Sequence, residues 1–173
     1  MGDEQESAGL QWLDADEQQH WNAFAYVLTQ LPTALEARMQ RDAGIAHFEY
    51  VVMSVLSMAP ERTLRMSEVA QYAGSALSRL SNVVIRLEKH GWVRRHPDPS
   101  DGRATLATLT DEGMAKVVAA APSHLDAVRR LVFDPLTKAQ QRQLGAASRR
   151  ILGALEAPYP SDWPGAAARS GQD

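Results

Sequence analysis

Residues 66–110 read MSEVAQYAGSALSRLSNVVIRLEKHGWVRRHPDPSDGRATLATLT, and this stretch decides the fold. It holds two short helical patterns separated by a turn that contains a glycine, followed by two strand patterns separated by a polar turn. Helix, turn, helix and hairpin in this order predict one compact module. The segments on either side of it are expected to be helices that carry this module.

The two helical patterns have recognisable boundaries. Ser67 is of a type that caps helix N-termini, and Gly74 is of a type that ends helices. The second helix is expected to begin at a cap provided by Ser75 or Ser78 and to end before Gly91. Its apolar positions recur at a spacing of three or four residues and comprise Leu77, Leu80, Val83, Val84 and Leu87.

The other face of this second helix is polar and suits the reading of DNA bases. Arginine can pair with guanine through two hydrogen bonds, asparagine can do so with adenine, and serine can bond to phosphate or base. The second helix of a helix-turn-helix enters the major groove with its N-terminal residues. The candidate side chains are Ser75, Ser78, Arg79, Ser81 and Asn82. Taken alone, the pattern also fits an ordinary surface helix with a solvated polar face.

The hairpin pattern favours the DNA-binding alternative. Strands are expected over residues 92–96 and 103–109, with a turn over residues 97–102. Arg103 leaves this turn, where an arginine can enter a narrow minor groove, and Asp101 can cap the turn and orient Arg103. The alternative is that Asp101 and Arg103 form only a local salt bridge. A helix-turn-helix followed at once by a basic hairpin predicts a winged helix.

Charge is unevenly distributed along the chain. The formal net charge is −3, but residues 79–103 hold six basic and three acidic side chains. This asymmetry indicates a local anion-binding face on an acidic body, although a solvated charged helix would produce it as well.

The sequence before the central stretch predicts two helices and a short strand. The first helix is capped by Asp14 or Asp16 and extends to Gly44, and Pro32 should kink or split it. A second, largely apolar helix covers residues 47–58, and residues 63–65 form a short strand.

The sequence after the central stretch predicts two further helices. Thr110 caps a helix over residues 111–133, which Pro122 should bend. Thr137 and Gln140 form a capping-box pattern that opens the last helix.

The expected fold is mostly α with a small β-hairpin wing (α+β). Residues 1–14 are expected to be a flexible tail, residues 15–157 a single domain, and residues 158–173 a disordered tail. Within the domain, the winged helix-turn-helix covers residues 60–110, and dimerisation helices cover residues 15–42 and 111–157. The outer helices carry more apolar surface than one small module can bury, which is a physical reason to expect a homodimer.

Composition excludes several classes of protein. The chain has no cysteine, so disulfides, thiol chemistry and cysteine-ligated zinc are absent. No apolar run approaches the roughly 20 residues that a membrane helix needs. The polar, acidic start does not resemble a signal peptide, and a cytoplasmic protein without a membrane partner is expected.

Several pieces of the sequence together resemble the MarR family of winged-helix transcription regulators. They are RLE-x-x-GWVRR from Arg86 to Arg95, the pair Asp101 and Arg103, and LT-x-x-G from Leu109 to Gly113. The order of the flanking helices also fits, so the resemblance covers residues 14–157. The branch of the family that senses peroxide uses a cysteine, which this chain lacks.

The resemblance implies an obligate homodimer that binds double-stranded DNA at a pseudo-palindromic operator, with the wings in the flanking minor grooves. It also implies a regulator, most often a repressor, that releases DNA when a small aromatic or phenolic anion binds. It adds phosphate contacts at Arg86, Arg94 and Arg95, and no cofactor is expected. The predicted DNA-binding residues are then Ser75, Ser78, Arg79, Ser81, Asn82, Arg86, Arg94, Arg95, Asp101 and Arg103.

The same resemblance places the effector between the dimerisation helices and the winged helix. Aromatic walls with one or two polar groups would suit a phenolic or carboxylate ligand. The candidate lining residues are Trp21, Tyr26, His47, Tyr50 and Met53. Alternatively, Trp21 and Tyr50 are core residues, and His47 only caps or packs a helix.

An enzyme and a protein-interaction module are the alternatives to a DNA-binding regulator. An enzyme is disfavoured because the five histidines are not paired at metal-ligand spacing and no phosphate loop or nucleophile elbow is present. A protein-interaction module built on a winged helix is the remaining alternative. Steep salt dependence of DNA binding separates a regulator from such a module.

Overall fold

In the computed structural model, the described part of the chain is residues 11–155. It forms two compact units, one ending at Ala34 and the other beginning at Leu35. The tails expected at residues 1–14 and 158–173 lie outside the described residues, apart from residues 11–14. None of the described helices combines the length and apolar content that crossing a membrane requires.

The first helix, α1 (Ala15–Ala43), passes from the first unit into the second. Asp14 caps it as expected, because its carboxylate accepts the Glu17 N–H at 2.8 Å and Glu17 accepts the Asp14 N–H at 3.0 Å. Pro32 lies inside α1 and does not split it. The helix ends before Gly44, whose φ of +65° is readily adopted only by a residue without a Cβ.

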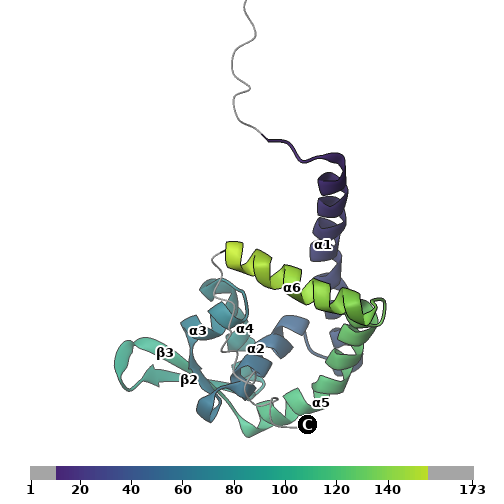
Figure 1. The fold of residues 1–173 in the computed structure, drawn as a ribbon. Coiled ribbons are helices and arrows are strands. Elements are labelled where there is room, and N and C mark those ends of the chain that lie inside the picture. The colour runs from purple at the N-terminus through teal and green to yellow at the C-terminus, as the bar shows by residue number, and fades with distance from the viewer. Residues whose placement is uncertain (1–10, 156–173) are drawn as a thin grey trace, which may run out of the picture. The chain divides into compact units, whose positions relative to one another are not determined.

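The second unit contains the winged helix and the helices that follow it (Figure 1). In chain order it contains α2 (His47–Met58), a 3-10 turn (Pro60–Arg62), β1 (Thr63–Arg65), α3 (Met66–Tyr72), α4 (Leu77–Lys89), β2 (Val93–Asp98), β3 (Asp101–Leu109), α5 (Asp111–Val128), a π-helical turn (Arg129–Phe133) and α6 (Lys138–Ala154). The strands form one antiparallel sheet in the order β1-β3-β2. The predicted mostly helical fold with a small β wing is confirmed.

One hydrophobic core lies under α4 and holds the helix-turn-helix against the sheet. On α4, Leu80, Val84 and Leu87 are fully buried, as the spacing of apolar positions predicts. They pack with side chains of α2, such as Val52 and Leu56, and with α3 and the sheet. Burial of each such side chain stabilises the fold by about 1.5–3 kcal/mol. The polar face of α4 is therefore directed away from the core.

The two helices of the helix-turn-helix begin differently from the predicted starts. Helix α3 begins at Met66, and Glu68 in its first turn accepts the N–H of Arg65, the residue before the helix, at 2.9 Å. Ser67 lies inside the helix, so the predicted cap at Ser67 is wrong. Helix α4 begins after Ala76 without a side-chain cap, so neither Ser75 nor Ser78 caps it as predicted. The Ser75 N–H instead donates to Ala70, closing the end of α3.

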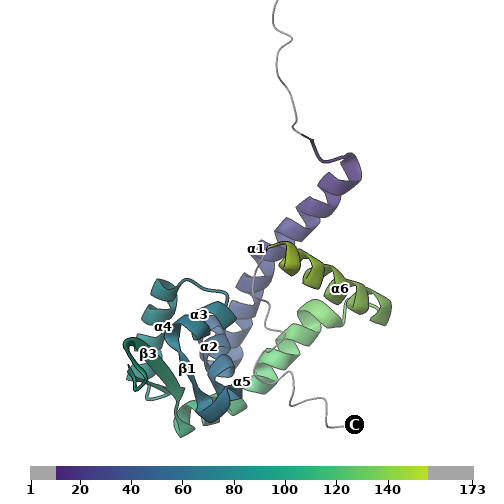
Figure 2. The ribbon, with the colours of Figure 1, turned by 60° about the vertical axis from the view of Figure 1, so that its left-hand side comes forward.

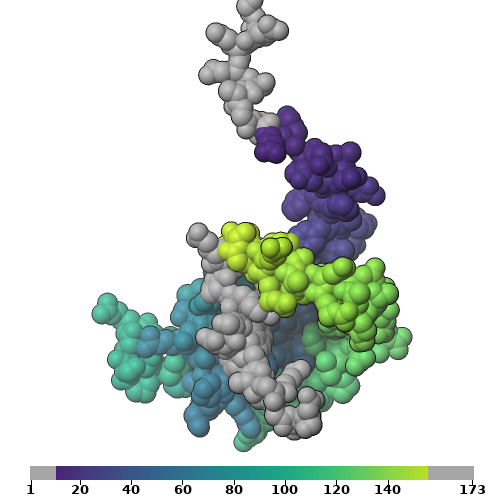
Figure 3. Space-filling view, in the orientation of Figure 1, coloured from purple at the N-terminus to yellow at the C-terminus, as the bar shows by residue number. Residues whose placement is uncertain are grey.

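The hairpin is longer and its turn tighter than predicted. Strand β2 begins at Val93 rather than Trp92, and the turn itself is only Pro99 and Ser100. The strands pair in a register that sets Val93 opposite Leu109, with an irregularity near the turn. Figures 1 and 3 show the hairpin as a projection from the second unit at the left of both views, and Figure 2 shows it turned toward the viewer.

The junction between β3 and α5 follows the LT-x-x-G pattern. Thr110 caps α5 as predicted, because its Oγ1 accepts the Gly113 N–H at 3.0 Å and donates to the Gly91 carbonyl at 2.7 Å. A side chain at Gly113 would overlap the Trp92 carbonyl oxygen. Helix α5 continues through Pro122 but ends at Val128, where a π-helical turn replaces the predicted last turn.

The last helix, α6, begins where its capping box predicts. Thr137 accepts the Gln140 N–H at 3.3 Å, and the Gln140 side chain accepts the Thr137 N–H at 2.9 Å. These bonds satisfy two of the N–H groups that a helix start leaves free.

Candidate nucleic-acid interface

The exposed ridge of α4 is the first part of the candidate interface. Ser78, Arg79 and Asn82 are exposed on it, and Ser81 is half-buried at its side. Ile85 and Lys89 are also exposed, although neither was among the predicted DNA-binding residues. Residues 78, 82, 85 and 89 are three or four apart, so helical spacing alone could have identified this stripe.

Two predicted DNA contacts on α4 are held by side chains from the start of α2. The Arg79 guanidinium lies over the Phe48 ring, 4.4 Å from its centroid. The Arg86 Nε donates to Glu49 at 3.0 Å. Cation–π contacts and ion pairs of this exposure contribute at most about 1 kcal/mol, so a phosphate or a base can compete for either arginine.

The basic residues of β2 have different surroundings. Arg95 bonds to Glu88 of α4 through its N–H at 3.0 Å and its Nε at 2.8 Å, and the Arg95 side chain holds the pKa of Glu88 below its usual value. This contact ties the wing to α4. Arg94, by contrast, is exposed.

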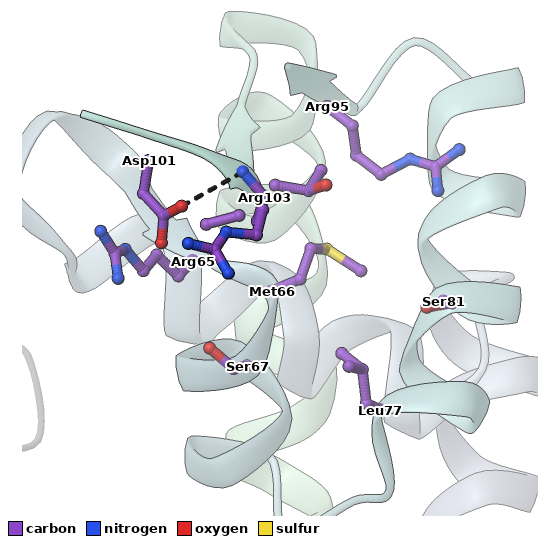
Figure 4. A pocket seen from close by; sticks show the side chains of 10 residues that line it. Arg65, Met66, Ser67, Leu77, Ser81, Arg95, Asp101 and Arg103 are labelled. Atoms are coloured by element: carbon purple, nitrogen blue, oxygen red, sulfur yellow. Dashed lines mark hydrogen bonds between the residues drawn. The ribbon is translucent and has the colours of Figure 1, made fainter. Parts of the chain in front are cut away.

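A groove with a volume of about 430 Å³ lies between the wing and the helix-turn-helix. Figure 4 shows the Arg103 side chain among the residues that line this groove, beside Arg65 and Asp101 and on the same side as Met66 and Ser67. Its lining residues are Arg65, Met66, Ser67, Leu77, Ser81, Arg95, Asp101, Arg103, Ala104 and Thr105. Three arginines and several hydroxyl groups give it the chemistry that a phosphate backbone requires.

Asp101 bonds to the backbone at the wing turn. Its carboxylate accepts the Arg103 N–H at 3.2 Å, as drawn in Figure 4. The ion pairs of the described residues do not include one between the Asp101 and Arg103 side chains. This geometry matches the predicted turn cap rather than the local salt bridge, and it leaves the Arg103 guanidinium exposed.

Asp98 of the wing and Arg65 of β1 form a contact that was missed from sequence. Asp98 is 7% exposed, and its Oδ1 accepts the Ser100 Oγ–H at 2.6 Å and the Ser100 N–H at 2.8 Å. Its Oδ2 accepts the Arg65 Nε–H at 2.9 Å. The Ser100 bonds, followed by Arg65, lower the pKa of Asp98 to about 2. The Asp-Pro-Ser order at a turn is a local signal for the first half of this contact.

The predicted effector residues are distributed over both units. Trp21 and Tyr26 are exposed in the first unit. In the second unit Met53 is a core residue with no exposed surface, and Tyr50 is buried. His47 is half-buried. The structure therefore brings together only part of the predicted set.

His47 and Tyr50 meet at His124 of α5, which sequence reasoning did not place in the site. The rings of His47 and His124 stack with centroids 5.5 Å apart, and the Tyr50 ring is 4.6 Å from His124. Burial lowers the pKa of both histidines, Glu36 partly offsets this for His47, and His47 lowers the pKa of His124 further. The buried Nδ1 of His124 has no hydrogen-bond partner in the structure. The cluster is aromatic and polar, and the lowered pKa values favour the neutral form of both histidines.

Comparisons with known proteins agree with this architecture. The MarR family model matches residues 45–104. The structure of Sco3205, a MarR family transcriptional regulator from Streptomyces coelicolor in complex with DNA, is 45% identical, covers 91% of this chain and 98% of its own, and has a TM-score of 0.81. AbsC, another MarR family regulator of that organism, is 31% identical, covers 85% of this chain and 99% of its own, and has a TM-score of 0.78.

Curated relatives match a shorter part of the chain. The transcriptional regulator PapX of Escherichia coli is 34% identical over 71 residues, which are 41% of this chain and 43% of PapX. The chain spans about half the length of the first curated relatives that it matches. These relatives are transcriptional regulators, so the comparisons support a regulator rather than an enzyme. From its identity to Sco3205 along nearly the whole of that protein, and from its own winged helix, we conclude that the chain belongs to the MarR family of winged helix-turn-helix transcriptional regulators.

Proposed function

We propose that the protein is a homodimeric repressor that binds a pseudo-palindromic operator and releases it when a small aromatic anion binds. Helix α4 lies in the major groove, and each wing enters the flanking minor groove. The observation that carries this proposal is the joint exposure of the α4 ridge and of Arg103 in one compact unit. Sco3205, the relative with 45% identity, was solved in complex with DNA.

Base reading is assigned to the exposed start of α4. Ser78, Arg79 and Asn82 supply short and long hydrogen-bonding side chains on one face. Lys89 and Arg94, both exposed, add positive charge for the phosphates. Arg86 and Arg95 reach phosphate if they exchange or share their carboxylate partners.

The dimer is supported by apolar side chains that are exposed in each unit. In the second unit Leu144 and Ile151 of α6 are 40% and 44% exposed, and Phe133 before α6 is 42% exposed. In the first unit Trp21 and Tyr26 are more than half exposed. Clusters of this kind on separate elements are typical of surfaces that a protein partner covers. A second copy of the chain covers them in this proposal.

The effector site is proposed around His47, Tyr50 and His124. An aromatic anion would stack on these rings and provide an acceptor for the unpartnered His124 nitrogen. The same turn of α2 carries Phe48 and Glu49, the partners of Arg79 and Arg86. A ligand that shifts this turn would alter the position of both arginines, which is a physical route to DNA release.

The test is a mobility shift with the DNA around the protein's own gene, at several salt concentrations and with salicylate and other phenolic acids. We expect binding that weakens steeply with salt, since phosphate contacts release counterions, and binding that salicylate reverses. No shift with any promoter fragment would favour the protein-interaction module instead. A mobility shift that no phenolic acid reverses would support the proposed DNA binding and refute phenolic acids as the effector.

A further inference from the structure

A single buried carboxylate joins the wing turn to the start of the helix-turn-helix. Among residues 11–155, Asp98 is the only charged residue that is buried. One of its oxygens accepts both donors of Ser100 in the turn, at 2.6 and 2.8 Å. The other accepts Arg65, at 2.9 Å from Nε and 2.8 Å from Nη2. Each oxygen therefore holds a different segment of the chain.

Arg65 lies where β1 ends and α3 begins. Its N–H is bonded by Glu68 in the first turn of α3, and it pairs in register with Leu106 of β3. The guanidinium that holds Asp98 thus belongs to the residue that starts the first helix of the motif. The position of the wing turn is set relative to α3 through two side chains.

The wing has little other support near its tip. A two-stranded hairpin alone is marginally stable, and the β2–β3 pairing is irregular between Pro97 and Asp98. The Glu88–Arg95 contact ties the wing to α4 farther from the turn. The Arg65–Asp98 contact is closer to the tip, and Arg65 and Arg103 line the same groove (Figure 4).

We propose that Arg65 and Asp98 are positioning residues that hold the wing so that Arg103 meets the minor groove while α4 lies in the major groove. This inference rests on the proposed DNA-binding function. The two contacts lie in different grooves, so a wing that pivots loses one of them when the other is made. A preorganised wing avoids the entropic cost of fixing this geometry upon binding.

A double-mutant cycle between Asp98 and Arg103 tests the coupling. In the otherwise unchanged protein, Arg103→Ala should weaken operator binding by about tenfold, which corresponds to about 1.4 kcal/mol. In the Asp98→Ala background, the same change should weaken binding less than about twofold, because a free wing no longer places Arg103. Asp98→Ala alone should lower operator affinity and keep affinity for random DNA, where wing geometry matters less.

Asp111→Asn is the matched control. It removes the Arg62–Asp111 ion pair, which has the same 2.8 Å distance and residue types but lies on the surface away from the wing turn. In that background Arg103→Ala should keep its full tenfold effect. If Asp98→Ala does not fold, Asp98→Asn enters the cycle, since its side-chain oxygen still accepts from Ser100. Hydrogen exchange at residues 99–103 of either folded variant should be faster than in the parent.

Three outcomes separate this inference from the proposed function. If Arg103→Ala lowers operator affinity equally with and without Asp98, the positioning role is overturned but the proposed DNA-binding function stands. Unchanged exchange at the wing turn in the Asp98 variants would overturn it as well. No effect of Arg103→Ala in the parent protein would instead refute the proposed wing contact, and with it this inference.

Discussion

At the scale of single residues, three arginines of the candidate interface already have partners within the protein. Phe48 holds Arg79, Glu49 holds Arg86 and Glu88 holds Arg95. Such partners reduce the conformational freedom that long side chains lose upon binding. They also mean that net charge alone says little about which arginine reaches DNA.

Asn82→Ala is predicted to weaken operator binding by about 1–3 kcal/mol, and Arg79→Ala should have an effect of the same size. Both side chains are exposed on α4, where a hydrogen bond to a base edge would be lost. Titration with operator and mutated operator DNA measures the effect, which should shrink when the paired base is changed. Gln143→Ala on exposed α6 is the control, and equal losses on all DNA sequences would contradict base reading.

Gly113→Ala is predicted to destabilise the fold by about 1–3 kcal/mol, as overpacking does. The new Cβ would overlap the backbone carbonyl of Trp92, which cannot move without disturbing the bonds of Thr110. Chemical denaturation measures the change. Gly153→Ala in α6 is the control, because nothing lies within 4 Å of its Cβ position, and equal stabilities of the two variants would contradict the steric reason.

At the scale of elements, the first turn of α2 connects two parts of the second unit. Through His47 it contacts α5, and through the next two residues it contacts α4. A helix is stiff over one turn, so displacement of His47 is passed to residues 48 and 49. This turn is therefore the shortest connection between the proposed effector site and the DNA-reading ridge.

Acidification is predicted to weaken the packing of α2 against α5. The pKa values of His47 and His124 lie below 6.5 in the folded protein, so the unfolded chain binds protons first as the pH falls through 6.5. Stability is thus fully present above pH 6.5 and declines below it. Thermal unfolding between about pH 7.5 and pH 5 measures this decline.

The double variant His47→Gln with His124→Gln should lose less stability over that interval than the parent protein. His20→Gln, at an exposed position of the first unit, is the control and should behave as the parent does. An equal decline in the parent and the double variant would show that other groups govern the acid response.

At the scale of the whole molecule, the described chain leaves apolar surface exposed on both of its units. On α6 the exposed positions 144 and 151 share one face by helical spacing, Leu155 follows directly after the helix, and α5 adds Val118 and Leu125. The regulator proposed here acts as two copies, since a palindromic site presents two equivalent half-sites. Dimerisation and operator affinity should then be lost together.

Ile151→Asp is predicted to shift the protein from dimer to monomer, because a carboxylate would be buried without a partner in the interface. Light scattering after gel filtration measures the mass, and a mobility shift measures the accompanying loss of operator affinity. Gln143→Asp, on an exposed position of the same helix, should remain dimeric. A monomeric parent protein, or a dimeric Ile151→Asp, would contradict the assigned interface.

Local patterns determined most of the elements. The apolar spacing of α4 predicted its buried face correctly at positions 80, 83, 84 and 87 but not at Leu77, which is exposed. The Thr110 and Thr137 caps were predicted because a cap depends on neighbouring residues only. The same reasoning failed at Ser67 and Ser75. Ser67 is not a cap because β1 continues up to α3 and Arg65 precedes the helix. Ser75 is not a cap because its N–H donates to Ala70 and ends α3. Both outcomes depend on which of two adjacent elements a residue joins, and this is not visible from a single residue type.

The sequence by itself determined the winged helix and the polar ridge of α4, since both follow from periodicity and turn residues. Only the tertiary structure decided the partners of the charged groups. Asp98 lies 33 residues from Arg65, and Glu49 lies 37 residues from Arg86. Such pairs depend on how strands and helices pack, and no short-range pattern encodes them. The stretch over residues 66–110 thus specifies the module, and contacts from outside it hold its arginines and its wing in place.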